Sequence, residues 1–183
     1  MNHYIEIKLL PDPEFPATVL LNSLITKLHK TLCDLNATSI GISFPNMSIT
    51  LGNVLRLHGT VSDLEHLQEC NWIGGMSGYC QVSKILPVPT EAKHRTVSRV
   101  QSTMSQSKLK RLLKRGSVTE EEVKAYRAKM FTKGIDNPYL ELTSGSNGHR
   151  HRRYLQFGEL FDKPVLGKFD QFGLSKTATV PWF

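Results

Sequence analysis

Two hydrophobic periods alternate through residues 1–90, and this alternation restricts the fold more than any other feature of the sequence. Residues 4–10 (YIEIKLL) alternate apolar and polar side chains, which predicts a strand with one buried face. A proline-rich turn follows, and Pro16 suits the first turn of a helix. Over residues 17–35 leucines recur at regular helical spacing, which predicts a helix with one side against the core: Leu20, Leu24, Leu28 and Leu32.

Shorter elements of the same two kinds complete this half of the chain. Residues 39–45 and 53–60 have the composition of strands and are separated by turn residues. Ser62 and Glu65 have the spacing of a capping box, which predicts a short helix. Residues 80–89 predict a fourth strand that its prolines end. The resulting order, β-α-β-β-α-β, is that of a ferredoxin-like domain.

A second, smaller module is expected over residues 91–183, because prolines and polar residues end the strand pattern before it. Thr119 and Glu122 form a capping-box pattern that opens the second of its two helices. The glycine-rich and aromatic C-terminal residues match no element clearly. The predicted class is therefore α+β, a ferredoxin-like domain followed by an α/β module with a helix rich in arginine and lysine. The expected elements of the module are a strand at 96–102, helices at 105–115 and 119–130, and strands at 139–144 and 150–157.

Positive charge is concentrated in the acid-free stretch Lys93–Thr119, within a chain of 183 residues and net charge +7. A helical projection of residues 105–115 places Leu109, Leu112 and Leu113 opposite the cations. Like charges one turn apart are destabilising until an anion neutralises them, so phosphate binding is favoured over a plain solvated helix. An anionic membrane is the competing partner, but it favours bulkier apolar side chains. The cations of the stretch are Lys93, Arg95, Arg99, Lys108, Lys110, Arg111, Lys114 and Arg115.

The sequence favours RNA over DNA, since it contains neither the ligands of a zinc finger nor the helix spacing of a helix-turn-helix reader. The three cysteines form no C-x-x-C pair, so neither a disulfide framework nor a zinc site is expected. No signal pattern or long apolar run occurs, and we expect a soluble, cytoplasmic protein without cofactor or metal.

For catalysis, a histidine is the natural candidate, because imidazole titrates near neutral pH. His29 lies one residue after Leu28, at the margin of the core, and from its position alone it can equally be an ordinary boundary histidine. Ser144 and Ser146 flank a glycine at a strand end and are by themselves turn residues. No acidic cluster is present that would hold the metals of a two-metal nuclease.

Three segments together resemble the type I-F CRISPR endoribonucleases, which cut precursor repeat RNA. They are HYIEIKLLPDPEFP leading to KLHK, VSRVQS before the basic helix, and FGLSK with VPWF, so the resemblance covers nearly the whole chain. It implies a metal-independent enzyme of the Cas6 superfamily that binds the repeat stem-loop and cuts at its 3′ base. The products would carry a 2′,3′-cyclic phosphate and a 5′-hydroxyl, and the enzyme would stay on the guide RNA within a surveillance complex, as a monomer when free.

The resemblance also assigns residues to the reaction. His29 matches the catalytic histidine, and Ser144 matches the serine that holds the 2′-hydroxyl nucleophile, with Ser146 as a weaker contact. Phe172 stands where the family pattern has tyrosine, so this side chain can only pack or orient. His151 stands where the pattern has a phenylalanine that stacks on the terminal base pair.

The resemblance further implies how the RNA is bound. Arg99 and Gln101 would read base edges near the bottom of the stem, since arginine suits guanine and glutamine suits adenine. The basic helix would enter the major groove of the hairpin and contact its phosphates through Lys108, Arg111, Lys114 and Arg115. Two other functions stay open: a subunit that binds the guide-RNA hairpin without cutting, and a DNA-binding regulator.

Overall fold

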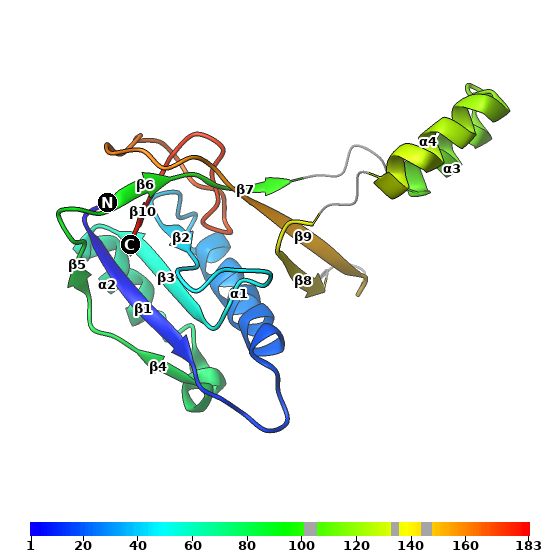
Figure 1. Ribbon diagram of the computed structural model, residues 1–183. Helices are drawn as coiled ribbons and strands as arrows, with labels where there is room; N and C mark the ends of the chain where they lie inside the picture. The colour runs from blue at the N-terminus through cyan, green and yellow to red at the C-terminus, as the bar shows by residue number, and fades with distance from the viewer. Residues whose placement is uncertain (101–105, 133–135, 144–147) are drawn as a thin grey trace.

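The computed structural model describes residues 1–100, 106–132, 136–143 and 148–183, without the side chains of 106–107 and 129–132. Figure 1 shows a mixed α/β architecture of three sheets and four α-helices in the described part, which agrees with the predicted mixture of helices and strands. None of the described helices is long and apolar enough to cross a membrane. The elements are β1 (His3–Leu9), α1 (Ala17–Asp34), β2 (Gly41–Ser43), β3 (Val54–Gly59), α2 (Val61–Glu69), a 3₁₀ helix η1 (Gly74–Tyr79), β4 (Cys80–Val82), β5 (Leu86–Pro87), β6 (Lys93–Arg95), β7 (Val97–Val100), α3 (Gln106–Lys114), α4 (Glu120–Thr132), β8 (Tyr139–Thr143), β9 (Arg150–Phe157) and β10 (Val180–Trp182).

The largest sheet has the order β2-β3-β1-β4, with all neighbours antiparallel and β5 also paired to β1. Ile5, Ile7 and Leu9 alternate toward the core and are at most 1% exposed, so the period of two seen in the sequence sets the register of β1. Ile5 pairs with Leu57 of β3, a central pair of buried side chains.

Helix α1 forms where the leucine repeat predicted it, and every leucine of that repeat is at most 5% exposed. The helix ends in a Schellman motif. Asn36 adopts the left-handed conformation with φ 51°, and the amide of Ala37 donates to the carbonyl of Leu32. This stop fixes where the C-terminal turns of α1 lie, and His29 belongs to those turns.

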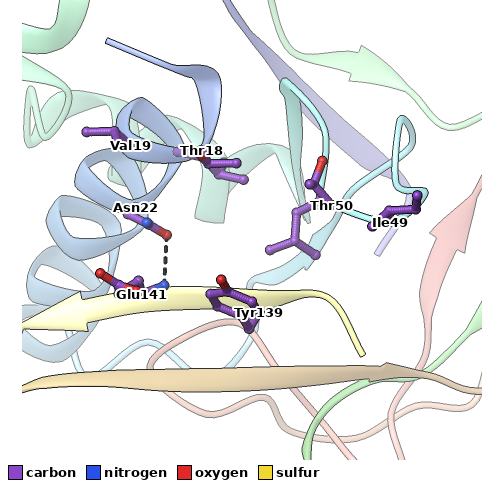
Figure 2. Close-up of a pocket in the computed structure, with 9 residues that line it drawn as sticks. Thr18, Val19, Asn22, Ile49, Thr50, Tyr139 and Glu141 are labelled. Atoms are coloured by element: carbon purple, nitrogen blue, oxygen red, sulfur yellow. Dashed lines mark hydrogen bonds between the residues drawn. The ribbon is translucent and has the colours of Figure 1, made fainter. Parts of the chain in front are cut away.

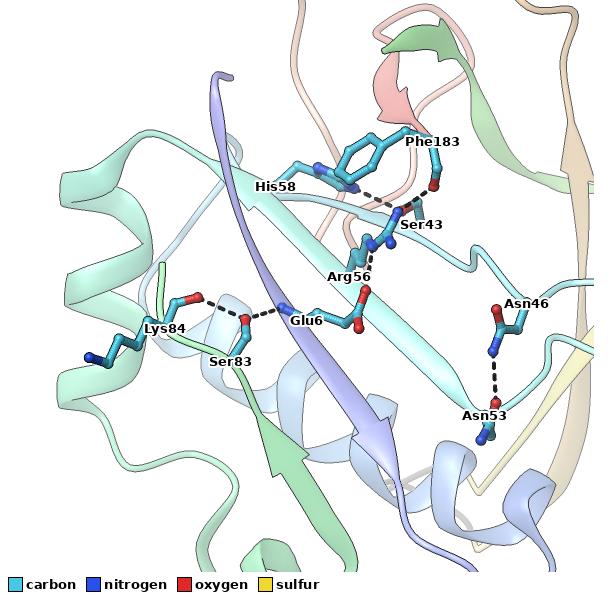
Figure 3. A network of polar contacts seen from close by, with 9 residues as sticks. All are labelled: Glu6, Ser43, Asn46, Asn53, Arg56, His58, Ser83, Lys84 and Phe183. Atoms are coloured by element: carbon cyan, nitrogen blue, oxygen red, sulfur yellow. Dashed lines mark hydrogen bonds and ion pairs between the residues drawn. The ribbon is translucent and has the colours of Figure 1, made fainter. Parts of the chain in front are cut away.

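Two local expectations in this half are wrong. The capping box that opens α2 is formed by Thr60 and Asp63, two residues before the expected Ser62 and Glu65. Leu64 and Leu67, three residues apart on this helix, are fully buried on its core side. The expected strand at 80–89 is divided into β4 and β5, because the Ser83 hydroxyl accepts the Glu6 amide and donates to the Lys84 carbonyl (Figure 3).

Residues of the second half build two further sheets, β10-β6 and β7-β9-β8, and share the core of the first. Val97, Leu140 and Leu155 are buried in one cluster with Ile42 and the leucines of α1. The pairing of β10 with β6 explains the C-terminal segment that matched no element: its partner strand lies far away in the sequence.

Figure 3 shows how the last residue is held against β3. Arg56 donates to the carboxylate of Glu6 at 2.7 Å and to the backbone oxygen of Phe183, and its guanidinium lies 4.2 Å from the centre of the Phe183 ring. Nearby, His58 is fully buried and its Nε2 atom lies 2.7 Å from the Ser43 hydroxyl. Burial, reinforced by the charge of Arg56, lowers the pKa of His58 to about 3.

The two remaining helices, α3 and α4, are drawn apart from the sheets in Figure 1. Leu109 is 2% exposed, but Leu113 is 46% exposed, so the expected apolar side of α3 is only partly covered. Gly116, with φ 64°, ends the helix after residue 114. Helix α4 begins at the predicted capping box, in which the Glu122 amide donates to the Thr119 hydroxyl and the Thr119 amide to the Glu122 carboxylate.

Candidate active site

A pocket of about 230 Å³ lies where α1, the ends of β8 and β9, and the turn before β10 meet. The side chains that line it come from segments separated by more than a hundred positions in the sequence. Three of them, His29, His151 and Arg153, are titratable or charged. The lining residues are Thr26, His29, Leu142, Thr143, His151, Arg153 and Phe172.

The orientation of His29 is set by one backbone hydrogen bond. Its Nδ1 atom lies 2.8 Å from the carbonyl oxygen of Gln171. A carbonyl oxygen can only accept, so Nδ1 carries a proton, and in the neutral imidazole the free lone pair is on Nε2. The sulfur of Cys33 lies 3.6 Å from Nδ1 and 3.9 Å from Nε2, at the range of weak contacts with sulfur. A neutral imidazole with Nε2 as acceptor is the form that a general base requires.

Phe172 is held between the side chains of His29 and Arg153. Its ring is stacked on the His29 ring with centroids 3.6 Å apart and an interplanar angle of 17°. The guanidinium carbon of Arg153 also lies 3.6 Å from the centroid of the same ring. Both separations are van der Waals contact, so the two groups cannot share one face of the ring and must cover opposite faces. The pocket therefore contains an ordered stack of His29, Phe172 and Arg153.

A tight turn presents Phe172 and the Gln171 carbonyl to α1. The Asp170 carboxylate accepts the amides of Phe172 and Leu174 at 2.8 and 3.0 Å. Gly173 has φ 71°, and its carbonyl oxygen accepts a hydrogen bond from the amide of Ile42 in β2. A Cβ at this glycine would lie 2.7 Å from Cγ2 of Ile42. The FGLSK segment thus needs glycine here, both for the left-handed backbone and for the close approach to β2.

The strand register places three basic side chains on one face of the β7-β9-β8 sheet. His151 and Arg153 alternate with outward residues along β9, and Arg99 of β7 is paired with Leu155, which shares their face. Arg153 is only 9% exposed. Burial, and after it the charge of Arg99, lower the pKa of Arg153, and Asp170 offsets part of this effect. Arg153 still remains protonated, as a guanidinium does in proteins.

A side-chain hydrogen bond joins β8 to α1, as Figure 2 shows. The amide of Glu141 in β8 donates to the Asn22 side-chain oxygen at 3.1 Å. A second hollow of about 220 Å³ lies beside this contact and includes Tyr139 and Ile49. The carboxylate of Glu141 faces the other way, toward Arg152 at 3.6 Å. This tie fixes the distance between the α1 turn that carries His29 and the strands that carry His151.

The structure brings together some of the predicted site residues. His29, Phe172 and His151 line one pocket, and Arg99 lies on the adjoining strand. Lys108, Arg111, Lys114 and Arg115 are exposed on α3 or directly after it, and α3 is drawn apart from the pocket in Figure 1. Gln101, Ser144 and Ser146 lie outside the described residues. Among the residues that the structure describes, no group of three or more histidine, cysteine or acidic side chains is placed to hold a metal ion.

Sequence reasoning missed Arg153, Asp170 and the Gln171 carbonyl as parts of the pocket. Arg153 belongs to a second basic cluster, residues 149–153, whose composition does not single it out. The period of the strand contained the missing information, because Arg153 shares its face with Leu155, which is fully buried. The other two depend on the turn geometry, and no periodicity in the sequence reports it.

An imidazole, neighbouring guanidinium groups and a separate basic helix are together typical of a protein that binds or processes nucleic acid. Comparison with known families makes this specific: the model of the CRISPR-associated protein family Cas_Csy4 matches residues 4–183. The chain belongs to the Cas_Csy4 family of CRISPR-associated proteins.

Two curated relatives agree over the full lengths of both chains. The CRISPR-associated endonuclease Cas6/Csy4 of Escherichia coli (strain UTI89 / UPEC) is 40% identical over 184 residues, and that of Pseudomonas aeruginosa (strain UCBPP-PA14) is 36% identical over 187 residues. Each alignment covers 100% of this chain and 100% of the relative. The expected family is confirmed, and the expected class of enzyme, an endonuclease, is the one named for both relatives.

A solved structure of the CRISPR endoribonuclease Cse3 bound to a 19 nt RNA aligns with 99% of this chain and 100% of its own, at 12% identity and a TM-score of 0.40. That score is too low to establish a shared arrangement of elements.

Proposed function

We propose that the chain is a metal-independent endoribonuclease that cuts CRISPR repeat RNA at the 3′ base of its stem-loop. The observation that carries the proposal is the hydrogen bond from His29 Nδ1 to the Gln171 carbonyl, which makes Nε2 the acceptor of the neutral imidazole in a pocket that Arg153 also lines. This is the arrangement needed to take a proton from a ribose hydroxyl next to a phosphate.

The reaction is a transesterification within the RNA. His29 takes the proton of the 2′-hydroxyl, the 2′-oxygen forms a bond to the adjacent phosphorus, and the bond from phosphorus to the 5′-oxygen breaks. The departing 5′-oxygen takes up one proton, so a proton moves between two oxygens and no water is consumed. The products are a 2′,3′-cyclic phosphate and a 5′-hydroxyl. Ser144 would hold the 2′-hydroxyl in line, with Ser146 as a second contact, since misorientation prevents such an attack.

The proposed RNA surface has two parts. Arg99 and Gln101 would read bases at the bottom of the stem, next to the pocket, and His151 would stack on the terminal base pair. The cations of α3 and Arg115 would contact the groove and its phosphates, which relieves the repulsion between like charges one turn apart. Phe172 would orient His29, because its ring stacks on the imidazole. Without a hydroxyl, the ring cannot donate a hydrogen bond to the RNA.

We propose the following setting for this activity. Residues 1–90 form a ferredoxin-like domain, which the antiparallel order β4-β1-β3-β2 supports, and residues 91–183 form the RNA-binding module. The protein acts in the cytoplasm, where its three free cysteines stay reduced. It is a monomer when free, stays on the mature guide RNA after cutting, and joins other subunits of a type I-F surveillance complex.

The test compares His29→Ala with the parent protein on a repeat hairpin in EDTA, with enzyme in excess. Cleavage by the parent in EDTA and a loss of at least about a hundredfold in the variant are expected, the usual range for a lost general base. His66→Ala, an exposed histidine on α2, is the matched control and keeps the parent rate. Undiminished cleavage by His29→Ala, or a parent enzyme that needs Mg²⁺, would refute the proposal.

Phe172 favours one second candidate, a subunit that binds the guide-RNA hairpin without cutting it. The family pattern has a tyrosine at this position, and the phenylalanine cannot donate a hydrogen bond there. Tight binding of a repeat hairpin that stays intact during long incubation with the parent protein would select this candidate.

A further inference from the structure

Within the part of the chain that the structure describes, the guanidinium of Arg153 is a buried charged group with an unsatisfied hydrogen-bond donor. The side chain is 9% exposed, and its buried Nε atom has no hydrogen-bond partner among the described residues. Buried polar groups are normally paired, and an unpaired donor on a charged group is costly. The same side chain lines the pocket of His29, so an anion in that pocket reaches the guanidinium.

We propose that Arg153 binds the phosphate at which the RNA is cut and stabilises the negative charge that develops on it. This inference rests on the proposed function, and it adds a catalytic residue that the family resemblance did not supply. The ligand is a phosphodiester of RNA, held through its non-bridging oxygens by the guanidinium.

The stack with Phe172 supplies the geometry. Since His29 and Arg153 each lie 3.6 Å from the Phe172 centroid on opposite faces, the imidazole and the guanidinium are about 7 Å apart at most. A base within hydrogen-bond reach of the 2′-hydroxyl, an attacking oxygen about 3 Å from phosphorus, and a donor on a non-bridging oxygen bridge such a span around the edge of the ring. Phe172 thereby fixes the distance between the proton acceptor and the phosphate-binding group.

The charges around Arg153 also favour an anion. Arg99 lies on the same face of the sheet, one strand away, and repels it, while Asp170 alone among the named neighbours attracts it. The Asp170 carboxylate already accepts two backbone amides of the turn. A phosphate between the two arginines would balance both charges, and the extra charge of a pentacovalent phosphorus would be bound more strongly than the ground state.

Arg153 adds no bond-making or proton-transfer step to the reaction described above. The 2′-oxygen bonds to phosphorus, the 5′-oxygen leaves, and Arg153 keeps all its protons throughout. Its contribution is electrostatic, so removal should lower the rate of cutting more than the affinity for the hairpin.

The experiment measures the rate constant for cutting pre-bound hairpin in EDTA, and separately the Kd for a hairpin with a 2′-deoxy nucleotide before the cleavage site. Arg153→Ala should lower the rate by about a hundredfold or more and change the Kd by less than about tenfold. Added guanidinium ion should restore part of the rate to Arg153→Ala in a concentration-dependent way, and should not help His29→Ala. Arg153→Lys keeps the charge, and its cleavage rate should lie between the rates of the parent and of Arg153→Ala.

The matched control is Arg152→Gln, which removes the same charge from the outward face of β9, where Arg152 faces Glu141. Its rate on bound RNA should equal that of the parent. A phosphorothioate at the cleavage site gives a readout that does not depend on folding of a variant. In the parent, sulfur at one non-bridging position should slow cutting more than sulfur at the other, and Arg153→Lys should lose this preference.

Arg153→Ala that cuts at the parent rate overturns the inference. The inference is also overturned if Arg153→Ala cuts slowly, guanidinium does not restore its rate, and Arg153→Lys keeps the phosphorothioate preference of the parent. Arg153 would then only support the position of Phe172. If His29→Ala is inactive in the same assays, the proposed function survives that failure. If His29→Ala cuts normally, the proposed function fails whatever Arg153 does.

Discussion

Gly173 offers a direct test of how the turn before β10 builds the site. In Gly173→Ala the new Cβ would lie 2.7 Å from Cγ2 and 3.2 Å from the amide nitrogen of Ile42, with the backbone at φ 71°. A left-handed backbone costs a residue with a Cβ about 1–2 kcal/mol, and forcing an extra methyl into a packed site costs about 1–3 kcal/mol. The free energy of unfolding should therefore fall by about 2–5 kcal/mol.

Gly173→Ala should also displace the groups that orient His29. Relief of the clash moves the turn away from β2, and with it the Gln171 carbonyl and the Phe172 ring that orient His29. A displacement of about 1 Å lowers a rate by about a hundredfold, so single-turnover cleavage should fall by that order.

Substitutions at two other glycines separate the cost of the left-handed backbone from the cost of the steric clash. Gly74→Ala has the left-handed backbone, φ 51°, but meets only the end of a lysine at 3.6 Å, and should lose about 1–2 kcal/mol. Gly75→Ala meets nothing within 4 Å and should stay within about 0.5 kcal/mol of the parent. Urea unfolding gives the free energies. Gly173→Ala with the stability of Gly74→Ala and the parent cleavage rate would refute the account of this turn.

Three further outcomes follow. Burial holds the pKa of His58 at about 3 against 6.5 in the unfolded chain, so between these values only the unfolded chain takes up the proton. Stability should fall by about 2 kcal/mol on going from neutral pH to about pH 5; His58→Asn should remove this loss and His66→Asn should keep it, by urea unfolding at both pH values. Arg115→Gln should weaken hairpin binding and reduce the slope of log K against log salt by about one, by titration at several salt concentrations. Gln101→Ala should mainly relax the preference for one base at the bottom of the stem, measured by competition between hairpins.

Elements with strict periodicity could be predicted from the sequence, because one pattern of burial satisfied them. The alternation of Ile5, Ile7 and Leu9 and the leucine repeat of α1 each have a single register that buries the apolar face. Elements that depend on one local competition could not. The Ser83 hydroxyl interrupts the expected fourth strand, and Thr60 rather than Ser62 caps α2. Both outcomes depend on which of several nearby side chains makes the hydrogen bond with the backbone.

The site divides in the same way. Its residue types followed from the resemblance of three sequence segments, and the structure places His29, Phe172 and His151 in one pocket. The stack of Arg153 on Phe172 depends on the register of β9 and on the turn at Gly173, two features from distant parts of the chain. No periodicity within one segment reports a contact between two segments, so the stack of Arg153 on Phe172 is visible only in the folded structure.

The nature of the cut ends tests the central claim most directly. A repeat hairpin cut by the parent protein in EDTA is analysed by mass spectrometry. Attack by the 2′-hydroxyl with His29 as base predicts a 2′,3′-cyclic phosphate on the upstream fragment and a 5′-hydroxyl on the downstream one. A 3′-hydroxyl with a 5′-phosphate would contradict the account, because those ends require an attacking water.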